Sequence, residues 1–313
     1  MSAARETAVQ VAIVGGGPAG LAAALTLSRS MIRTLVIESE EPARNGASPF
    51  VASLPGLDRQ KPDDVRGAIR SDISAYPYAS FRRGKVEDLR KSGPVFKLIL
   101  SEETVAADLV LLATGMVDQY PPLTNLHSFW GRSIINCPFC HGIEWQGARW
   151  GIFADRPEVL AAAEIYLNWS DDLVYFVGPG AGMDESRHSE LLNLGIQVEP
   201  NLPQGVNGSE GALTGTLMPD GRKIDLDCLL VYPYQKVPEL VERLSPTLRE
   251  DGSVWVDEGY RSSIPGLYAA GDLVYQGHQN TPTALHMGNL AAASIVMDLC
   301  FGKGSSPVIP GSS

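Results

Sequence analysis

The chain has 313 residues, of which 44% are hydrophobic and 19% are charged, and its formal net charge is −11. This length allows two domains, each with its own core. An acidic surface repels phosphate backbones and anionic lipids, so we expect neither nucleic acid nor a membrane surface as a partner. No apolar run reaches the ~18–20 residues of a membrane helix. The N-terminal segment lacks the apolar core of a signal peptide, so we expect a cytoplasmic protein.

Two α/β patterns follow one another along the chain. The first begins with a strand, a helix and a strand at residues 10–14, 21–30 and 34–37, which together form a βαβ unit. Apolar runs at 95–100 and 109–112 predict two further strands. The second pattern is a strand, a helix and two strands, predicted at residues 150–153, 157–167, 173–177 and 229–232.

The second pattern is predicted to be inserted in the first. Tyr120-Pro121-Pro122 marks the crossing, and a strand at 266–270 and a helix at 282–299 return the chain to the first pattern. We therefore expect an α/β fold of two Rossmann-like domains, formed by residues 1–118 with 239–313, and by residues 119–238. The Gly-, Ser- and Pro-rich residues 302–313 are typical of a disordered tail.

A glycine-rich turn follows the first predicted strand. Gly15, Gly17 and Gly20 fit the pattern G-x-G-x-x-G. The first glycine allows a tight turn, the second lets a pyrophosphate approach the backbone, and the third lets the helix pack on the strand. The helix N-terminus attracts the phosphates, and Glu38 at the end of the next strand can hold a ribose diol. A turn without a ligand is the alternative, but this context favours a bound dinucleotide.

Cys137 and Cys140 form a Cys-x-x-Cys pair. At this spacing both sulfurs can lie on one helical turn and close a small disulfide ring. Pro138 suits a first helical position, and a helix start here would lower the pKa of the first thiol. His141, directly after the pair, is a candidate acid or base near neutral pH. A histidine that is merely hydrogen-bonded is the alternative reading.

The remaining cysteines and histidines carry weaker signals. Half a zinc site is the alternative for the Cys pair, but no second Cys/His pair has zinc-site spacing, and we expect no metal. Cys228 and Cys300 are interpreted as core residues. Four histidines are interpreted as structural or surface groups, the last two being weak candidates because they flank the final helix: His127, His188, His278 and His286.

The order of these motifs resembles two-dinucleotide-binding flavoproteins, and over residues 9–300 it resembles the low-molecular-weight thioredoxin reductases. Ala113-Thr114-Gly115 is similar to their ATG turn, Gly271-Asp272 to their flavin-binding Gly-Asp, and the start of the last helix to the one that faces the flavin. The resemblance implies FAD as cofactor and a homodimer. It implies FAD contacts at Gly15, Gly17, Pro18, Ala19, Gly20, Glu38, Asn45, Val86, Ala113, Thr114, Gly115, Gly271, Asp272, Asn280 and Thr281.

Two departures from those reductases bear on function. His141 stands where they usually have Asp, and the string Cys-Pro-Phe-Cys-His-Gly is similar to the dithiol oxidases of gliotoxin and holomycin biosynthesis. The strand at 150–153 is followed by Asp155 and Glu158 with no glycine, so a pyrophosphate could neither approach the backbone nor escape repulsion. Arg187, amid acidic residues, is a poor substitute for an arginine that would bind a 2′-phosphate. A divergent turn that still binds NADPH is the alternative.

These departures predict an FAD-dependent oxidase that forms an intramolecular disulfide in a small-molecule dithiol. The catalytic residues would be Cys137, Cys140 and His141, and O2 would accept the electrons. A disulfide reductase for a thioredoxin-like protein, fed by NADPH or by a protein donor such as ferredoxin, is the second hypothesis. A non-enzymatic flavin redox sensor is the third, although such a module has no need of two exchangeable sulfurs.

Overall fold

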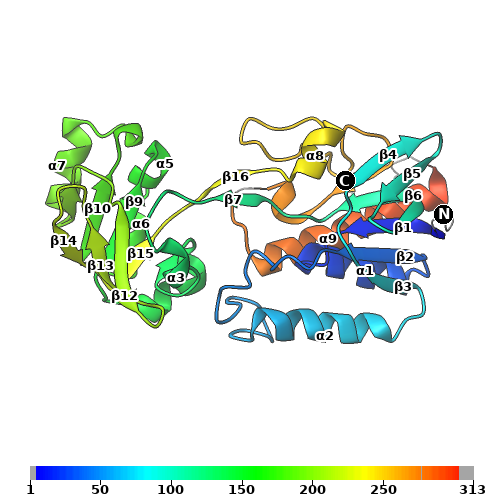
Figure 1. Ribbon diagram of the computed structural model, residues 1–313, viewed down its shortest axis with the longest axis horizontal. Coiled ribbons are helices and arrows are strands. Elements are labelled where there is room, and N and C mark those ends of the chain that lie inside the picture. The colour runs from blue at the N-terminus through cyan, green and yellow to red at the C-terminus, as the bar shows by residue number, and fades with distance from the viewer. Residues whose placement is uncertain (1–4, 276, 303–313) are drawn as a thin grey trace, which may run out of the picture. The chain divides into compact units, whose positions relative to one another are not determined.

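The computed structural model describes residues 5–275 and 277–302 and divides into two units (Figure 1). Unit 1 is formed by Met1–Arg44, Asp63–Val117 and Gln235–Ser313, and unit 2 by Asn45–Pro62 and Asp118–Tyr234. The divisions near 118 and 235 lie close to the predicted crossings. The assignment of residues 45–62 to the first domain is wrong, because this segment packs on unit 2. The predicted disordered tail falls outside the described residues, except for Gly302.

Unit 1 is built on a seven-stranded sheet of order β3-β2-β1-β6-β5-β4, with β17 also paired to β6. Its first three strands, β6 and β17 are parallel, whereas β4 and β5 are antiparallel additions. Every strand predicted in this part of the chain is confirmed. The strands are β1 (Arg5–Val14), β2 (Thr34–Glu38), β3 (Ala79–Arg83), β4 (Asp88–Ser92), β5 (Val95–Ile99), β6 (Glu103–Leu112) and β17 (Leu267–Ala269).

Both faces of this sheet are covered, as its apolar strands require. Because side chains alternate along a strand, Val11 and Ile13 of β1 join one core and Ala12 and Val14 the other. The core that contains Val11 and Ile13 is covered by α1 and α9, which pack on each other, and by α2 (Figure 1). The helical segments of this unit are α1 (Pro18–Arg29), α2 (Pro62–Ser74), α8 (Glu239–Leu244), η3 (Gly271–Leu273) and α9 (Thr281–Phe301).

Helix α9 is longer than the helix predicted at 282–299, and it is rich in apolar residues. By length and by a mean hydropathy of 1.4 it could cross a membrane. Packing within unit 1 also accounts for its small apolar residues, because α9 packs on α1 and Gly288, Ala291 and Ala292 are buried. Near its end, Asp298 is buried and bonded to Arg261 through both carboxylate oxygens, at 2.7 Å each. A buried carboxylate is tolerated when it is paired in this way.

Unit 2 has a five-stranded parallel sheet of order β11-β10-β9-β15-β8 and a three-stranded antiparallel sheet of order β12-β13-β14. The chain passes between the units through β7 (Val117–Gln119) and β16 (Tyr234–Lys236), which pair with each other. The sheet strands are β8 (Ile134–Ile135), β9 (Trp150–Ala154), β10 (Leu173–Val177), β11 (Gln197–Glu199), β12 (Gly205–Ser209), β13 (Ala212–Leu217), β14 (Lys223–Asp225) and β15 (Cys228–Leu230).

The helices of unit 2 are short. They are α3 (Leu126–Phe129), α4 (Pro138–His141), η1 (Gly142–Trp145), α5 (Pro157–Leu160), α6 (Ala163–Tyr166), η2 (Pro179–Ala181) and α7 (Glu185–Asn193). The single helix predicted at 157–167 is wrong, since it is broken between α5 and α6. The Arg187 side chain donates to the carbonyl of Leu160 at 3.0 Å and so satisfies the end of α5.

The two cysteines outside the Cys-x-x-Cys pair differ in exposure. Cys228 is buried in β15, as predicted, and burial raises the pKa of its thiol. The prediction that Cys300 belongs to the core is wrong, because it is exposed in the last turn of α9. The apolar surroundings in the sequence suggested a core position, but the burial of α9 is confined to the stripe that faces α1 and the sheet.

Candidate functional site

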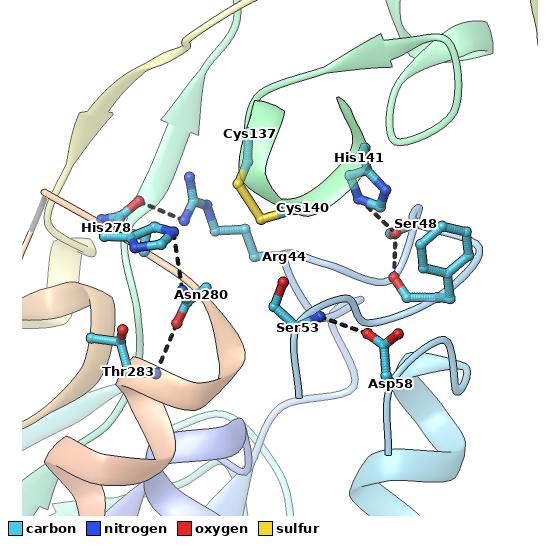
Figure 2. The surroundings of a disulfide bond; sticks show 12 residues. Arg44, Ser48, Ser53, Asp58, Cys137, Cys140, His141, His278, Asn280 and Thr283 are labelled. Atoms are coloured by element: carbon cyan, nitrogen blue, oxygen red, sulfur yellow. Dashed lines mark hydrogen bonds between the residues drawn. A yellow bond between two sulfur atoms is a disulfide. The ribbon is translucent and has the colours of Figure 1, made fainter. Parts of the chain in front are cut away.

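Cys137 and Cys140 are joined in a disulfide at the start of α4 (Figure 2). Their Cα atoms are 5.3 Å apart. Cys137 is the residue before the helix, and its carbonyl accepts from the N–H groups of Cys140 and His141 at 3.2 Å each. Pro138 occupies the first helical position, as predicted, where its missing N–H costs nothing. Both cysteines are half-buried, so the disulfide is neither a core staple nor fully exposed.

His141 ends α4 and is half-buried against the loop at 45–62. Its Nε2 lies 3.2 Å from the Oγ of Ser48, and its ring centroid lies 5.2 Å from that of Phe50 (Figure 2). Burial lowers the pKa of His141 from its usual value of about 6.5, and the negative charge of Glu144 opposes this in part. The imidazole is therefore neutral at pH 7 and able to accept a proton.

An apolar surface adjoins the disulfide. Phe139, between the two cysteines, is 58% exposed, and Ile143 is 64% exposed. The Phe139 ring packs edge-on against Trp169, with centroids 5.3 Å apart. Gly142 makes this possible, because a Cβ there would lie 2.6 Å from the Trp169 ring. In unit 2 the Cys137–Cys140 disulfide therefore lies next to an exposed aromatic and an exposed aliphatic side chain.

The turn after β1 in unit 1 has the geometry that a pyrophosphate requires. Gly15 has φ +115°, and a Cβ there would lie 2.2 Å from the Ala113 carbonyl oxygen. A Cβ on Gly20 would lie 2.0 Å from the Gly15 carbonyl oxygen, so this glycine allows α1 to pack on the strand. The space over Gly17 is open, and no side chain caps the first turn of α1. The N–H groups there remain available to an anion.

Two arginines accompany the acidic residues of unit 1. Glu38, at the end of β2, is paired with Arg70 of α2, whose guanidinium also stacks over Phe81. Asp272 is paired with Arg44 at 2.8 Å. Each carboxylate therefore sits in a partly neutralised, half-buried setting, in which it can accept a hydrogen bond from a ribose or ribityl hydroxyl.

The start of α9, η3 and the first turn of α1 converge on Ala19. A Cβ on Gly271 would lie 3.0 Å from the Ala19 Cβ, and a Cβ on Gly288 would lie 2.0 Å from the Ala19 carbonyl oxygen. Asn280 caps α9, since its side chain accepts from the N–H of Thr283 at 2.8 Å. The side-chain amide oxygen of Asn280 is therefore already hydrogen-bonded to α9. The N-terminal half of α9 therefore lies next to the glycine-rich turn at Gly15 to Gly20, the fingerprint turn.

The turn after β9 in unit 2 is filled by its own side chains. Arg156 bonds both carboxylate oxygens of Asp155, at 2.9 and 3.3 Å, and donates to the Tyr232 carbonyl at 2.6 Å. Its guanidinium carbon lies 3.6 Å from the centroid of the Tyr234 ring. The loop after β10 closes on this turn, because a Cβ on Gly180 would lie 2.8 Å from the Asp155 carbonyl oxygen. The Asp155 carboxylate is thus paired with Arg156, and the turn is packed with its own side chains and backbone.

Comparisons with known proteins agree with this architecture. Residues 9–148 and 179–288 match the pyridine nucleotide-disulphide oxidoreductase family. The chain belongs to this family. The thioredoxin reductase tcpT of Claviceps purpurea is 27% identical over 319 residues, which cover 96% of this chain and 98% of that relative.

Solved structures of the same fold cover nearly the whole chain. The putative thioredoxin reductase TrxB of Bacillus anthracis has a TM-score of 0.87 and 26% identity, and the match covers 93% of this chain and 99% of that one. The structure of HlmI has a TM-score of 0.85 and 26% identity, with 94% and 93% covered. The chain is therefore a thioredoxin-reductase-like oxidoreductase with two Rossmann-type domains, and its cofactor is FAD.

Most predicted FAD contacts belong to unit 1, and their geometry fits the cofactor at the open turn over Gly17. Ala113 lies against Gly15, Gly115 has φ +66°, and the Thr114 hydroxyl bonds to the Gly115 carbonyl at 3.3 Å. Val86 lies in the connection from β3 to β4 and its side chain is buried, so only its backbone could bind a ligand. Asn45 belongs to unit 2, and its contact with FAD stays a prediction.

The weaker histidine candidates at the start of α9 belong to unit 1. His278 lies 3.1 Å from the Asn280 amide, and both His278 and His286 are exposed in unit 1. The Arg187 side chain is paired with Glu164 and Glu190. Within residues 5–275 and 277–302, no group of three or more His, Cys, Asp and Glu side chains could hold a metal ion.

Sequence reasoning missed several residues that shape these sites. They are Ser48 and Phe50 beside His141, Arg70 beside Glu38, Arg44 beside Asp272, and Arg156 in the turn after β9. Only Arg156 carried a signal, since it stands in the turn where glycines were expected. The others lie tens of residues from their partners in the sequence and belong to no motif.

Proposed function

We propose that the protein is an FAD-dependent dithiol oxidase that closes an intramolecular disulfide in a small-molecule natural product. The observation that carries this proposal is the turn after β9. Asp155 and Arg156 fill the place in which a reductase of this fold would hold the pyrophosphate of NADPH. Without that supply of hydride, electrons would enter at the Cys137–Cys140 disulfide and leave towards an acceptor, for which we propose O2.

Thiol–disulfide exchange would follow from the disulfide in α4. One substrate thiolate attacks Cys137, the Cys137–Cys140 bond breaks, and Cys140 leaves as a thiolate. The second substrate thiolate then attacks the substrate sulfur of this mixed disulfide and releases Cys137. The substrate has lost two protons and two electrons and gained an S–S bond, while the cysteine pair has gained the two electrons.

His141 would serve as the base for these proton losses. Its pKa is lowered by burial, so most of the imidazole is neutral at pH 7 and can take a proton from a thiol of reference pKa about 8.5. The exposed Phe139 and Ile143 would favour a substrate with an apolar body beside its two thiols. A macromolecular partner is not needed for this chemistry.

FAD, when bound, supplies a two-electron acceptor for the reduced cysteine pair. The residues that would hold it are in unit 1. The backbone at Gly15 to Gly20 would bind the pyrophosphate, Glu38 a ribose diol, and Asp272 the ribityl chain. We further propose a cytoplasmic homodimer.

A thioredoxin-type reductase is the second candidate, because relatives such as that of Claviceps purpurea carry this name. Anaerobic flavin spectroscopy separates the two directions of electron flow. We expect a reduced small-molecule dithiol to bleach the flavin band and NADPH to leave it unchanged. Rapid stoichiometric bleaching by NADPH would refute the oxidase and favour the reductase.

A further inference from the structure

Ser48 has two polar neighbours but only one hydroxyl hydrogen. Its Oγ lies 2.7 Å from the carbonyl oxygen of Phe50 and 3.2 Å from the Nε2 of His141 (Figure 2). A carbonyl oxygen can only accept, so the hydroxyl hydrogen is directed to Phe50. The same oxygen can then only accept from His141. The hydrogen of the neutral imidazole must therefore be on Nε2, which leaves the lone pair on Nδ1.

The loop that carries Ser48 is held firmly in unit 2. The N–H of Ser48 donates to the Asn45 carbonyl at 3.1 Å. On the other side, a Cβ on Gly131 would lie 2.8 Å from the backbone of Ala47, so the two loops are in close contact. The guanidinium carbon of Arg59 lies 4.6 Å from the centroid of the Phe50 ring. The acceptor oxygen is thus fixed before any substrate binds.

We propose that Ser48 is a positioning residue that fixes neutral His141 as its Nε2–H tautomer and makes Nδ1 the atom that accepts a proton. In the other tautomer the lone pair of Nε2 would meet a lone pair of the serine oxygen, which is unfavourable. When His141 takes up a proton at Nδ1, the Nε2–H bond to Ser48 is kept, so no side chain has to move. The charged groups around this pair are Glu144, which raises the pKa of His141, and Arg59, which is paired with Glu144.

Nitrogen-15 NMR of histidine-labelled protein tests the tautomer directly. The chain has five histidines, and the signals of His141 are identified by their absence from the His141→Gln variant. Above pH 7 we expect a protonated Nε2 and an unprotonated Nδ1 in the native protein. We expect the same pattern in Ser48→Thr, which keeps the hydroxyl, and a shift towards the Nδ1–H tautomer in Ser48→Ala. A native protein with Nδ1–H, or a Ser48→Ala variant with an unchanged pattern, would overturn the proposal.

The kinetic part of the inference rests on the proposed function. The rate of dithiol oxidation near neutral pH should fall roughly 2- to 10-fold in Ser48→Ala, the factor that one ordinary hydrogen bond supplies. Ser48→Thr should restore most of it, and the loss in Ser48→Ala should shrink at high pH, where substrate thiols ionise unaided. A loss that is the same at every pH, or that Ser48→Thr shares, would contradict the positioning role. If the native protein oxidises no dithiol, the proposed function fails, while the NMR result still decides the tautomer.

Discussion

The two units each place a turn between a central parallel strand and a helix, but the two turns are packed differently. After β1, glycines keep the backbone clear over the first turn of a 12-residue helix. After β9, Asp155 and Arg156 occupy the corresponding space, and the helix that follows has only four residues. The shared architecture therefore says little about nucleotide binding, which depends on a few side chains in one turn.

The difference between the two turns indicates that the two units contribute different parts of the site. Unit 1 keeps the features that hold FAD, whereas unit 2 keeps the fold of a nucleotide domain but contributes the disulfide, His141 and an apolar surface. Under the proposed function, the packed turn after β9 would leave the disulfide as the entry point for electrons, without any change in topology.

Loss of either cysteine should have the largest effect and should test this division most sharply. Cys137→Ser and Cys140→Ser should each reduce dithiol turnover to the detection limit, because neither variant can form the exchangeable disulfide. Both should purify with native FAD content, since the fingerprint turn belongs to unit 1. Turnover and flavin absorbance measure the two effects. Near-native activity in either variant would mean that exchange does not pass through this pair.

Removal of the base in unit 2 should be the next largest effect. His141→Ala should slow dithiol oxidation by the ~10²–10⁴-fold typical of a lost general base, again with FAD retained. The deficit should narrow at high pH, and His141→Asp should not restore the rate at neutral pH. A pH–rate profile of all three proteins measures this. An unchanged rate and profile in His141→Ala would move the base elsewhere, and His278 and His286 would be tested next.

A methyl group in the turn after β1 should convert that turn into one that excludes the dinucleotide. In Gly15→Ala the new Cβ would lie 2.2 Å from the Ala113 carbonyl oxygen at φ +115°, so the backbone must shift and FAD affinity should be lost. Gly147→Ala is a matched control in unit 2, with φ +70° and nothing within 4 Å of the new Cβ. It should cost only the ~1–2 kcal/mol of a left-handed residue. Flavin content and thermal unfolding distinguish the two, and equal flavin content would contradict the fit.

Emptying the turn after β9 should weaken unit 2 without giving it a nucleotide site. Arg156→Ala removes the bonds to Asp155 and Tyr232 and the stack on Tyr234, which together should cost about 1–3 kcal/mol of unfolding free energy. Arg222→Ala, which removes an exposed arginine, should cost less. NADPH titration should show no binding to either variant, because no glycine lets a pyrophosphate approach. Tight NADPH binding to Arg156→Ala would mean that this side chain alone closes the site.

The difference between the two turns could be predicted from the sequence. The side chains that cause it could be predicted only in part. Glycines at 15, 17 and 20 and their absence after residue 154 predicted one open turn and one closed turn. The prediction rested on the missing glycines and on repulsion by Asp155 and Glu158. The structure shows in addition that Arg156 is paired with the Asp155 carboxylate. Side-chain pairing across the chain is set by tertiary packing, which short patterns do not encode.

The loop at 45–62 also makes contacts that short sequence patterns did not predict. Its position in the chain assigned it to the first domain, but Ser48 and Phe50 contact His141 in unit 2. At the break between α5 and α6, the Leu160 carbonyl accepts from Arg187, 27 positions further on in the sequence. Motifs whose residues are close in sequence, such as Cys137 to His141, were found in full. Contacts between distant segments were not.

The smallest expected effect concerns the charge beside His141, and it tests whether this imidazole is the titrating base. Burial lowers the pKa of His141, and Glu144 partly raises it again. A base loses activity as pH falls through its pKa, so the acid limb of the rate profile should lie below about pH 6.5. Glu144→Gln removes the influence that raises the pKa. Its acid limb should therefore move to still lower pH, and the Arg59 guanidinium, freed from its partner, would act in the same direction. Glu158→Gln, an exposed glutamate in the first turn of α5 that does not influence His141, should leave the limb in place. An acid limb that moves to higher pH in Glu144→Gln, or that is the same in all three proteins, would show that another group governs proton transfer.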